Sequence, residues 1–599
     1  NHTLSNSEMD QDLKTFDEIK KELNASNVEI YITGISLLSN ELKKGAENAL
    51  LLVIPLGLLV VFLLTTFYFR SIIAGALVIS LFAVSIIVAF AIGYIVLGYW
   101  LNRQISFISP SIVVVLTLGL CSDYSVYLLR RYKIERDEGK SKDEALRATT
   151  LWSSRGVITS ALAVLFSYII LSLMNIPLFG DAAIANTIGV SSTMITSLLF
   201  FPSVLYALGD KALWPYRKKE NKKKKVSRIY EFNIKRRVEI TLALTAITLV
   251  SLIFVANINT VLDVPPLMPD SEVQKGSLLL YSTIGSYMSP VYIYIEGKGN
   301  VLIGDNINQT YLNYVQQVAD AIASNKDVKY VYTIDRPLGQ KIYLNEIYAN
   351  STTKSVYLPL IKRFVGASNR SVLIEVILDK QPFSLQAIDV LKEIRSIIPR
   401  NENFTLLIDG VTQLSYDSKV VTDSATPTII ISLVTVIAIL LFLQLISILI
   451  PLRLIATILS SVAWSLALLY IVYSNLLSLP IINAVPIFLA VTMLGVGVDY
   501  DIFLLTRVRE EVVKGRSDEE AIKISLEKIG TTIMFLGLLL GSTFLLLLIP
   551  RFPLLNEIGF AIGLSVLFDS FVIVQFFVPS IMLIAKKWNW WPSRLGRRE

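Results

Sequence analysis

The sequence predicts a polytopic α-helical membrane protein with an internal duplication, in which two five-helix repeats and one leading helix carry an extracytoplasmic α/β domain. Three observations predict this fold class: many long apolar runs, a set of short motifs that recurs at a constant offset, and one long polar segment with mixed α and β patterning.

Apolar runs dominate the composition. Hydrophobic residues make up 53% of the chain and charged residues only 17%, whereas about 25% of residues are charged in typical soluble domains. The stretches Leu50–Phe69, Ile72–Leu97 and Ile529–Ile549 contain no acidic or basic residue. Because about 20 apolar residues cross the hydrocarbon core as a helix, the sequence predicts eleven membrane-spanning helices.

The positions of the basic residues predict the orientation of these helices. Basic residues gather in the loop 131–152, in the linker 209–237 with its run Lys222–Lys225, and at the C-terminus, where Arg597 and Arg598 follow Arg594. By the positive-inside rule these segments face the cytoplasm, so 1–47 and 257–426 lie outside. The net charge of +7 therefore anchors the chain in a membrane, and nucleic acid is not an expected partner.

Glycosylation acceptors of the form Asn-x-Ser/Thr agree with this orientation. All of them fall in the two segments predicted to lie outside, at Asn1, Asn24, Asn308, Asn350, Asn369 and Asn403. The alternative is chance, since polar segments are richer in Asn and Ser, but the cytoplasmic loops are polar too and have none. We therefore expect a glycoprotein of an archaeal or eukaryotic cell membrane, with a cytoplasmic C-terminus.

Internal repeats give the most specific signal in the sequence. The motif Gly119-Leu-Cys-Ser-Asp-Tyr124 matches Gly495-Val-Gly-Val-Asp-Tyr500, Ile30–Gly34 resembles Leu406–Gly410, and Pro177-Leu178 matches Pro553-Leu554. Every pair is 376 residues apart. A constant register across a polar segment and several helices predicts that the chain arose by duplication.

The duplication divides the chain into seven expected parts. They are 1–47, the C-terminal remnant of a first external α/β domain; 48–208, the first membrane repeat; 209–237, a basic cytoplasmic linker; 238–256, the leading helix of the second repeat; 257–426, the second external α/β domain; 427–585, the second membrane repeat; and 586–599, a basic cytoplasmic tail. Because copy one begins so late in the repeat, we expect a first helix and most of a first external domain to precede Asn1, or to come from a separate chain.

The external segment 257–426 alternates strand and helix patterns. Four β-branched or alternating runs predict strands at Val291–Ile295, Val328–Thr333, Val372–Leu378 and Phe404–Ile408. Helical apolar spacing lies between them at Tyr311–Ala323 and Leu385–Ile398. This is a β-α-β unit twice over, compatible with two small split sandwiches. Residues 8–48 repeat its last helix–strand–helix portion.

Few ionisable residues lie deep in the predicted spans, namely Asp123, Asp499, Asp501 and Asp569, and we expect no Lys, Arg or His at that depth. A charged side chain at a helix centre costs about 2.5–3.5 kcal/mol. A carboxyl group held in low dielectric can bind a proton near neutral pH, and so can take it from one side and release it to the other. The depth of these carboxyl groups in the predicted spans therefore favours a proton relay.

Tyr124 and Tyr500 can each donate a hydrogen bond to the carboxylate of the facing helix. Gly119, Gly495 and Gly497 are expected to let these helices approach closely. The alternative is a polar clamp without proton movement, but interhelical hydrogen bonds contribute only about 0.6–2 kcal/mol.

Asp501 and Asp569 are candidates for additional members of the relay. Asp501 is about 200° around the helix from Asp499 and is expected to face elsewhere. Asp569 is either a third relay member or a packing feature.

These motifs resemble the RND superfamily, in particular its MMPL-type exporters of lipids and hydrophobic compounds. The duplicated Gly-x-x-x-Asp-Tyr helix, the five-plus-one repeat and the external α/β domain carry the resemblance, which covers essentially the whole chain. It implies a porter-like external domain and proton-driven outward transport, with relay positions at Asp123, Tyr124, Asp499 and Tyr500. Copy one departs from the family pattern with Leu-Cys-Ser, and Asp569 lacks the Arg usual about one turn later, where Gln575 is the nearest polar residue.

Two other classes of protein share some of these features. A sterol-sensing or Patched-like sensor has the same bundle without active pumping, and an intramembrane aspartyl protease also needs two membrane carboxylates. A protease needs neither the repeat nor the external domain. With one Cys and one His in the chain, a disulfide framework is excluded and no metal site, cofactor or catalytic residue is expected. The expected partners are membrane lipid, a hydrophobic or amphipathic substrate, and protons.

Overall fold

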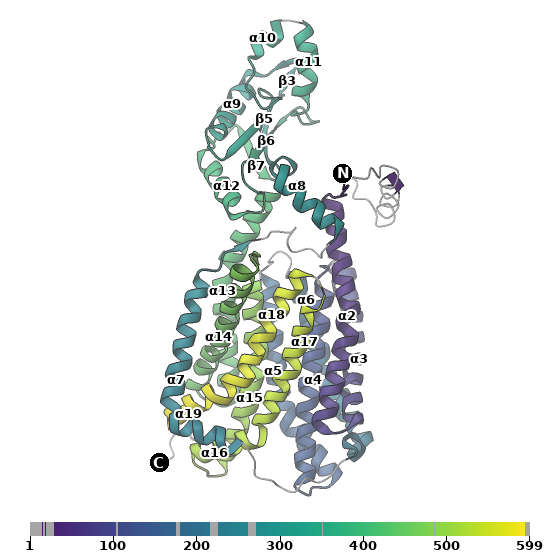
Figure 1. The fold of residues 1–599 in the computed structure, drawn as a ribbon, viewed down its shortest axis with the longest axis vertical. Helices are drawn as coiled ribbons and strands as arrows, with labels where there is room; N and C mark the ends of the chain where they lie inside the picture. Colours follow the sequence, from purple (N-terminus) through teal and green to yellow (C-terminus); the bar gives the residue numbers. More distant parts are fainter. Residues whose placement is uncertain are drawn as a thin grey trace. The chain divides into compact units, whose positions relative to one another are not determined.

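The computed structural model (Figure 1) describes the chain in ten stretches: residues 15, 18–19, 29–102, 106–174, 180–215, 226–261, 271–349, 351–483, 485–550 and 552–592. The chain divides into two compact units. One, the α/β unit, comprises Asn1–Ser39 and Thr260–Val421; the other, the helical unit, comprises Asn40–Asn259 and Thr422–Glu599.

The described residues include eleven helices long and apolar enough to cross a membrane, which confirms the predicted fold class. The first repeat contains α2 (Ile35–Phe69), α3 (Ile72–Gly93), η1 (Tyr94–Trp100), α4 (Ser109–Asp137), α5 (Lys142–Leu173), α6 (Gly180–Leu208) and η2 (Gly209–Leu213), and is followed by α7 (Val226–Ala256). The second contains α13 (Val411–Leu445), α14 (Leu449–Leu469), η4 (Tyr470–Leu476), α15 (Val485–Val513), α16 (Asp518–Ser525), η5 (Leu526–Gly530), α17 (Thr531–Leu545), η6 (Leu546–Leu548), α18 (Pro553–Phe568), η7 (Asp569–Phe577), α19 (Val578–Ala585) and η8 (Lys586–Trp590).

Element boundaries repeat with the sequence offset. Helices α2 and α13 are both 35 residues long and α4 and α15 are both 29. In each of these pairs the first residues are 376 positions apart, and so are those of the seven-residue π-helices η1 and η4. The backbone therefore carries the duplication as clearly as the motifs do.

The turn before the fourth helix of each repeat shows how local chemistry sets these boundaries. Gly139 and Gly515 take φ of +93° and +92°, a conformation that side chains with a Cβ rarely adopt. Two residues later, Ser141 and Ser517 cap the next helix by accepting the backbone N–H of the third helical residue. Glu144 returns a bond to the Ser141 backbone and completes a capping box.

The second repeat departs from the first in its last two helices. Helix α5 is continuous, but its counterpart is broken by the π-helix η5. Helix α6 is also continuous, whereas its counterpart contains η7, which begins at Asp569. Short π-helical segments inside α-helices are frequent at functional sites, so the interruption directs attention to Asp569.

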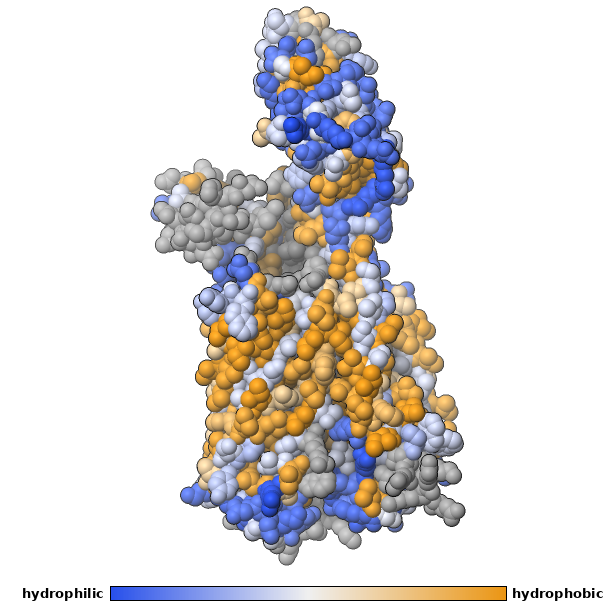
Figure 2. Space-filling model, turned by 180° about the vertical axis from the view of Figure 1, so that it is seen from behind, coloured by the Kyte–Doolittle hydropathy of each residue, from blue (hydrophilic) through white to orange (hydrophobic). Residues whose placement is uncertain are grey.

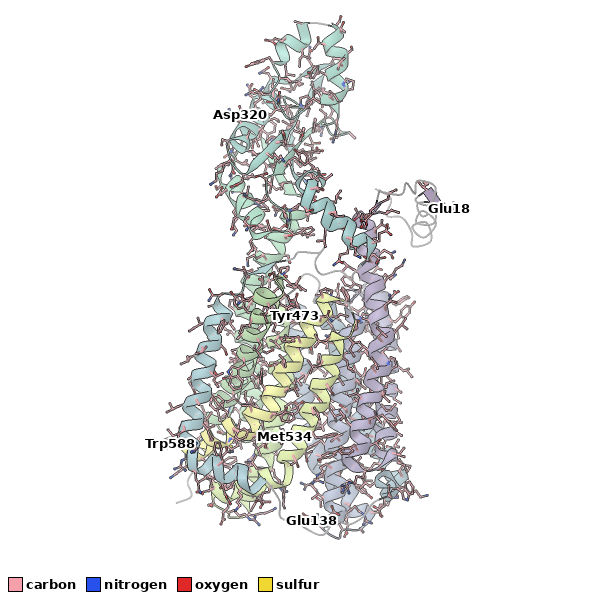
Figure 3. The ribbon with its side chains drawn as sticks, viewed as in Figure 1. Glu18, Glu138, Asp320, Tyr473, Met534 and Trp588 are labelled. Atoms are coloured by element: carbon pink, nitrogen blue, oxygen red, sulfur yellow. The ribbon has the colours of Figure 1, made fainter. Side chains whose placement is uncertain are left out.

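Helices α4 and α15 are the innermost of the helical unit. In their most apolar windows 94% and 100% of residues are buried, against 6% for α7. Hydrophobic side chains cover the flank of the bundle in a broad band, and hydrophilic ones gather at its lower end (Figure 2). Glu138, just after α4, lies at that end, and Tyr473 of η4 lies toward the opposite one (Figure 3). An apolar flank over buried carboxylates is the arrangement of a protein solvated by lipid.

The leading helix of the second repeat begins earlier than predicted. Helix α7 starts at Val226 rather than at 238 and kinks at Arg236, whose φ and ψ are −121° and 25°. Before the kink, Tyr230 donates to the Glu519 carbonyl at 2.7 Å and Asn233 to the Gln575 carbonyl at 2.8 Å. These bonds dock the second half of the predicted linker 209–237 on the second repeat. The run Lys222–Lys225 and the tail from 593 lie outside the described residues.

The α/β unit is built on one four-stranded antiparallel sheet of order β5-β6-β2-β7. Its elements are α8 (Glu272–Met288), β2 (Val291–Gly297), β3 (Leu302–Ile303), β4 (Asn306–Ile307), α9 (Gln309–Ala323), β5 (Val328–Tyr332), α10 (Leu344–Ala349), α11 (Ser351–Lys362), β6 (Ser371–Leu378), α12 (Leu385–Ile397) and β7 (Phe404–Asp409). A further two-residue strand, β1 (Thr260–Val261), precedes α8, and β8 (Ile481–Ile482) belongs to the helical unit.

The predicted strands and helices of this unit are present, but the two predicted sandwiches are one sheet. Strand β2 pairs with both β6 and β7. Strand β6 of the second β-α-β unit therefore lies between the two strands of the first unit, β5 and β2, and β7 lies at the edge of the sheet, a ferredoxin-like arrangement. Buried residues of α9 and α12 join those of the sheet in one core. Residues 29–34, expected to contain a strand, form none; instead Thr33 hydrogen-bonds Ser277 of α8 at 2.5 Å.

Half of the predicted glycosylation acceptors lie on described residues. Asn403 is exposed. Asn308 caps α9 by accepting the Thr310 N–H at 3.0 Å. Asn369 is partly buried, and its side-chain amide both accepts from and donates to the Leu302 backbone, at 2.9 Å each. The amide nitrogen that a glycan would modify is therefore hydrogen-bonded in this structure. Asn1, Asn24 and Asn350 lie outside the described residues.

A buried carboxylate lies at the end of β5. Asp335 is fully buried, and neither of its oxygens has a hydrogen-bond partner in the described part of the chain. Arg336 lies 3.5 Å away but pairs with Asp320 of α9, as does Lys341. Burial raises the pKa of Asp335 to about 6, and Lys341 opposes this shift.

Asp335 should therefore make the α/β unit less stable as the pH rises. The folded state keeps this proton between the unfolded pKa of 3.8 and about 6, so its stabilising contribution is complete below 3.8 and is lost through pH 6. The loss is at most about 3 kcal/mol. Asp335→Asn should slow hydrogen exchange of residues 328–345 at pH 8 and have little effect at pH 4. An equal effect at both pH values would contradict this expectation.

Candidate functional site

The four predicted carboxylates all lie buried inside the helical unit. Asp123 is on α4, Asp499 and Asp501 are on α15, and Asp569 begins η7. Each is fully shielded from solvent. The site is therefore contained within one compact unit and draws residues from both repeats.

One of the two expected tyrosine–aspartate contacts is formed. Tyr500 donates to Asp123 Oδ2 at 3.3 Å, which joins the second repeat to the first. The mirror contact is not made, because the Tyr124 hydroxyl instead accepts from Ser160 of α5 at 3.1 Å. Ser160 lies beside Asp499, whose two oxygens have no hydrogen-bond partner in the described residues. The two halves of the site are thus in different states.

The glycines near these pairs do not bring α4 and α15 together, contrary to expectation. A Cβ on Gly119 would meet Leu540 of α17, and one on Gly495 would lie 2.9 Å from Val164 of α5. The close backbone neighbours of α4 are α3, α5, α6 and α17, and those of α15 include α5 and α14. Gly119 and Gly495 therefore fit each central helix against a flanking helix of the other repeat, whereas Gly497 faces Ile458 of α14 in its own repeat. Side chains such as Tyr500 cross between the two central helices.

The expectation of no cation at this depth is wrong. Arg453 of α14 is buried and acts electrostatically on Asp501. Its Nη1 donates to the Val578 carbonyl at 3.5 Å, while Nε and Nη2 have no hydrogen-bond partner in the described residues. Asp501 therefore faces α14 and η7, on a different side of α15 from Asp499.

Asp569 belongs to the same side of the site. Both Asp499 and Asp501 act on it electrostatically. The side chain of Gln575, which the sequence offers in place of the Arg usual about one turn after Asp569, donates instead to the Gly530 carbonyl at 3.0 Å. Asp569 thus neighbours the other carboxylates through space, and Gln575 stabilises the helix break at η5.

These extra charges belong to the second repeat alone. At the offset of 376 residues, Arg453, Asp501 and Asp569 correspond to neutral residues, which are Leu77, Ser125 and Thr193. Only Asp123 and Asp499 are carboxylates in both copies. The duplication therefore supplied a symmetric pair, and the second repeat holds an additional charged group of three.

The arrangement is suited to binding protons. All seven carboxylate oxygens other than Asp123 Oδ2 lack a hydrogen-bond partner in the described residues, and buried polar atoms without partners are rare in folded proteins. The site holds four carboxyl groups and one guanidinium, which acts on Asp501, so full ionisation would leave several negative charges in low dielectric. Among the described residues, no group of three or more His, Cys, Asp or Glu could hold a metal ion.

Comparison with known proteins identifies the family. The model of the MMPL family matches residues 2–239 and 292–599. The chain belongs to the MMPL family. The fold comparison agrees: this MMPL protein resembles SecDF, a translocon-associated membrane protein from Thermus thermophilus, with a TM-score of 0.53 and 14% identity over 92% of the chain and 63% of SecDF.

Its relatives are bacterial. The apo-petrobactin exporter of Bacillus anthracis is 24% identical over 99% of this chain and 78% of its own length. The mycolic acid-containing lipids exporter MmpL11 of Mycolicibacterium smegmatis is 23% identical over 95% of the chain, which spans 58% of that protein. These relatives lend no support to the predicted archaeal or eukaryotic source.

Sequence reasoning missed two members of the site. Arg453 stands near the start of an otherwise apolar stretch, Leu449–Leu469, and an unexpected charge there was the available signal. Ser160 gave no signal, because a hydroxyl in an apolar helix is common and its partner depends on how α5 packs on α15. Both are contributed by helices that flank the central pair.

Proposed function

We propose that this MMPL protein is a secondary transporter that uses a proton gradient to export a lipid or another hydrophobic or amphipathic compound. The buried carboxyl groups carry the proposal, above all Asp123 with its bond to Tyr500 across the repeats. A transporter of this kind is an integral membrane protein without catalytic chemistry, and its proton relay comprises Asp123, Tyr124, Asp499 and Tyr500. Asp501 and Asp569 are additional members.

Protonation would change the charge between the two repeats and so shift one against the other. A proton supplies about 1.4 kcal/mol per pH unit and about 2.3 kcal/mol per 100 mV. In the described state Tyr500 holds Asp123, while Ser160 separates Tyr124 from Asp499. We infer that the cycle exchanges these partners, with Asp499 receiving Tyr124 in the other state.

The names of two relatives support export as the direction of transport, one names uptake, and the cargoes differ. They include exporters of apo-petrobactin and of mycolic acid-containing lipids, and also the heme uptake protein MmpL11 of Mycobacterium tuberculosis. The shared property is a cargo with substantial apolar or amphipathic character, and this class is what we propose for the present chain.

An apolar pocket in the first repeat supports a cargo of this class. It has a volume of about 340 Å³ and lies between α2, α3, α4 and α6, with Leu50, Phe90, Gly93, Tyr94 and Val113 among its lining residues. These residues lie toward the ends of the helices remote from Glu138. Burying an acyl chain there would contribute about 0.8 kcal/mol per methylene.

Filling this pocket should slow transport without unfolding the protein. A Cβ on Gly93 meets no atom within 4 Å, so a side chain can begin there in open space, and we expect Gly93→Leu to fill part of the pocket and lower transport about tenfold. Gly98→Leu is the matched control, because Gly98 is exposed on η1 and does not line the pocket. Equal transport by the two variants in proteoliposomes would remove the pocket from the pathway.

Transport by the purified protein in proteoliposomes tests the proposed function. A pH gradient, acidic on the side of the α/β unit, should drive a fluorescent lipid analogue toward that side, and a protonophore should abolish the movement. Binding of the analogue without any response to the gradient would favour a sterol-sensing or Patched-like sensor. Glycosylation at Asn403 stays a prediction, which mass spectrometry of the intact protein checks.

A further inference from the structure

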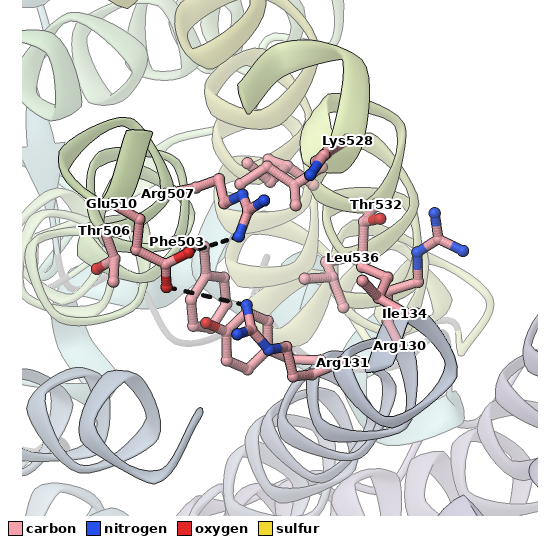
Figure 4. A pocket seen from close by; sticks show the side chains of 13 residues that line it. Arg130, Arg131, Ile134, Phe503, Thr506, Arg507, Glu510, Lys528, Thr532 and Leu536 are labelled. Carbon is pink, nitrogen blue, oxygen red and sulfur yellow. Dashed lines mark hydrogen bonds and ion pairs between the residues drawn. The ribbon is translucent and has the colours of Figure 1, made fainter. Parts of the chain in front are cut away.

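A basic cavity lies beneath the proposed relay, between α4, α15 and the η5–α17 segment (Figure 4). Four cationic side chains line it: Arg130 and Arg131 from α4, Arg507 from α15, and Lys528 from η5. Glu510 is its single lining carboxylate. All of these residues lie in the helical unit, near the end at which α4 terminates.

The neighbouring carboxylates are shared among several cations. Glu510 pairs with Arg507 at 2.5 Å and lies 3.9 Å from Arg131. Glu135 pairs with Arg131 and with Lys140. Glu511 pairs with Arg507, Lys514 and Arg516. Each of these three carboxylates therefore has at least two basic partners, and the cavity itself is lined by four cations and one carboxylate.

Two of the lining cations, Arg130 and Lys528, form no ion pair within the described part of the chain. Arg130 Nε is buried without a hydrogen-bond partner in the described residues, and so is the nearby Thr506 hydroxyl. Lys528 is attracted electrostatically by Glu511 and Glu138 and repelled by Arg507 and Lys514. Arg130 is half-buried and Lys528 is exposed, so both can reach an anion in the cavity, and such an anion would reduce the repulsion among the four cations.

The floor of the cavity is apolar. The rings of Tyr127 and Phe503 stack at 3.8 Å with an interplanar angle of 13°, and Ile533 and Leu536 of α17 complete the lining. The cavity is small, about 40 Å³, so it has room for a few water molecules or one phosphate group but not for a whole lipid. A ligand that fits has a compact anionic group and an apolar remainder.

We propose that this cavity binds the phosphate group of an anionic phospholipid from the leaflet at the Glu138 end of the bundle. Basic pockets between membrane helices on the cytoplasmic side are suited to lipid headgroups. Arg130 and Lys528 contact the phosphate, while the acyl chains stay in the membrane. Because Tyr127 and Phe503 stand one turn from Asp123 and Asp499, the bound lipid stabilises the helix arrangement beneath the relay. The site does not depend on the proposed transport.

Native mass spectrometry of the full chain tests this site. The protein is released from nanodiscs of equal phosphatidylcholine and phosphatidylglycerol, and the retained lipid is counted. We expect selective retention of phosphatidylglycerol, with Arg130→Gln and Lys528→Gln each reducing it roughly fivefold. The matched control is Lys514→Gln, which removes one charge outside the cavity and leaves Glu511 with two arginines. Equal loss in the control and the cavity variants would overturn the site.

Hydrogen exchange of the unmodified protein gives a second measurement that does not depend on any variant folding. Exchange at residues 126–137, 503–513 and 526–534 should be slower in nanodiscs with phosphatidylglycerol than in phosphatidylcholine alone. Inorganic phosphate added to phosphatidylcholine nanodiscs should give no such protection. Protection by inorganic phosphate alone would assign the cavity to a free anion, and protection by neither would overturn the proposal.

Discussion

An Asp499→Asn protein should fold normally and lose proton-driven transport completely. Asn keeps the shape and hydrogen-bonding capacity of Asp but cannot titrate, so the variant removes only the charge change. Asp499 is fully buried on α15 and is the residue of the second repeat that corresponds to Asp123. In proteoliposomes its rate under a pH gradient should equal the rate without one. Full transport by both Asp499→Asn and Asp123→Asn would reject the relay and favour the sensor.

A pair of tyrosine variants adds a control for this result. Tyr500→Phe removes the hydroxyl that binds Asp123, whereas Tyr124→Phe removes a hydroxyl that only accepts from Ser160. Tyr500→Phe should therefore weaken the described state more, and the two variants should shift the pH dependence of transport in opposite directions. Identical profiles would mean that the difference between the two halves has no role in the cycle.

Much of the fold could be predicted because the apolar runs of a membrane protein indicate where its helices cross the membrane and the basic residues of its loops indicate their orientation. Apolar runs predict the membrane-spanning parts of α2, α4 and α15, but the helices extend beyond them: α2 begins at Ile35, and α4 and α15 continue to Asp137 and Val513. In the α/β unit, β2 alternates buried and less buried residues as its pattern predicts. The single sheet could not be foreseen, because local alternation does not say which strands pair.

The candidate site divides in the same way. The repeat singled out Asp123 and Asp499, since two carboxylates at equivalent depth are costly unless they are used. Their partners depend on packing: Tyr500 reaches Asp123, yet Ser160 comes between Tyr124 and Asp499. The glycine motif suggested contact between α4 and α15, but those glycines fit flanking helices. Sequence symmetry therefore predicted the members of the site but not its asymmetric state.

Arg453→Leu should strongly destabilise the helical unit, and changing its partner as well should restore most of the loss. Arg453 and Asp501 are buried opposite charges that interact electrostatically, and leaving one such charge uncompensated typically costs about 3–5 kcal/mol. Leu77 and Ser125 of the first repeat occupy the positions of Arg453 and Asp501, so the fold already accommodates Leu and Ser there. The double variant Arg453→Leu/Asp501→Ser should therefore be close to the unmodified protein in stability.

Thermal unfolding in detergent, measured for both single variants and the double one, gives the coupling between the two side chains. A coupling of about 2 kcal/mol is expected for two buried opposite charges that interact electrostatically. Arg453→Leu should also recover part of its stability at acidic pH, because protonation of Asp501 then removes the uncompensated charge, whereas the double variant should show no such recovery. Additive effects of the two substitutions would mean that Arg453 stabilises the bundle through its contact with the Val578 carbonyl and that Asp501 faces the relay without a fixed counter-ion.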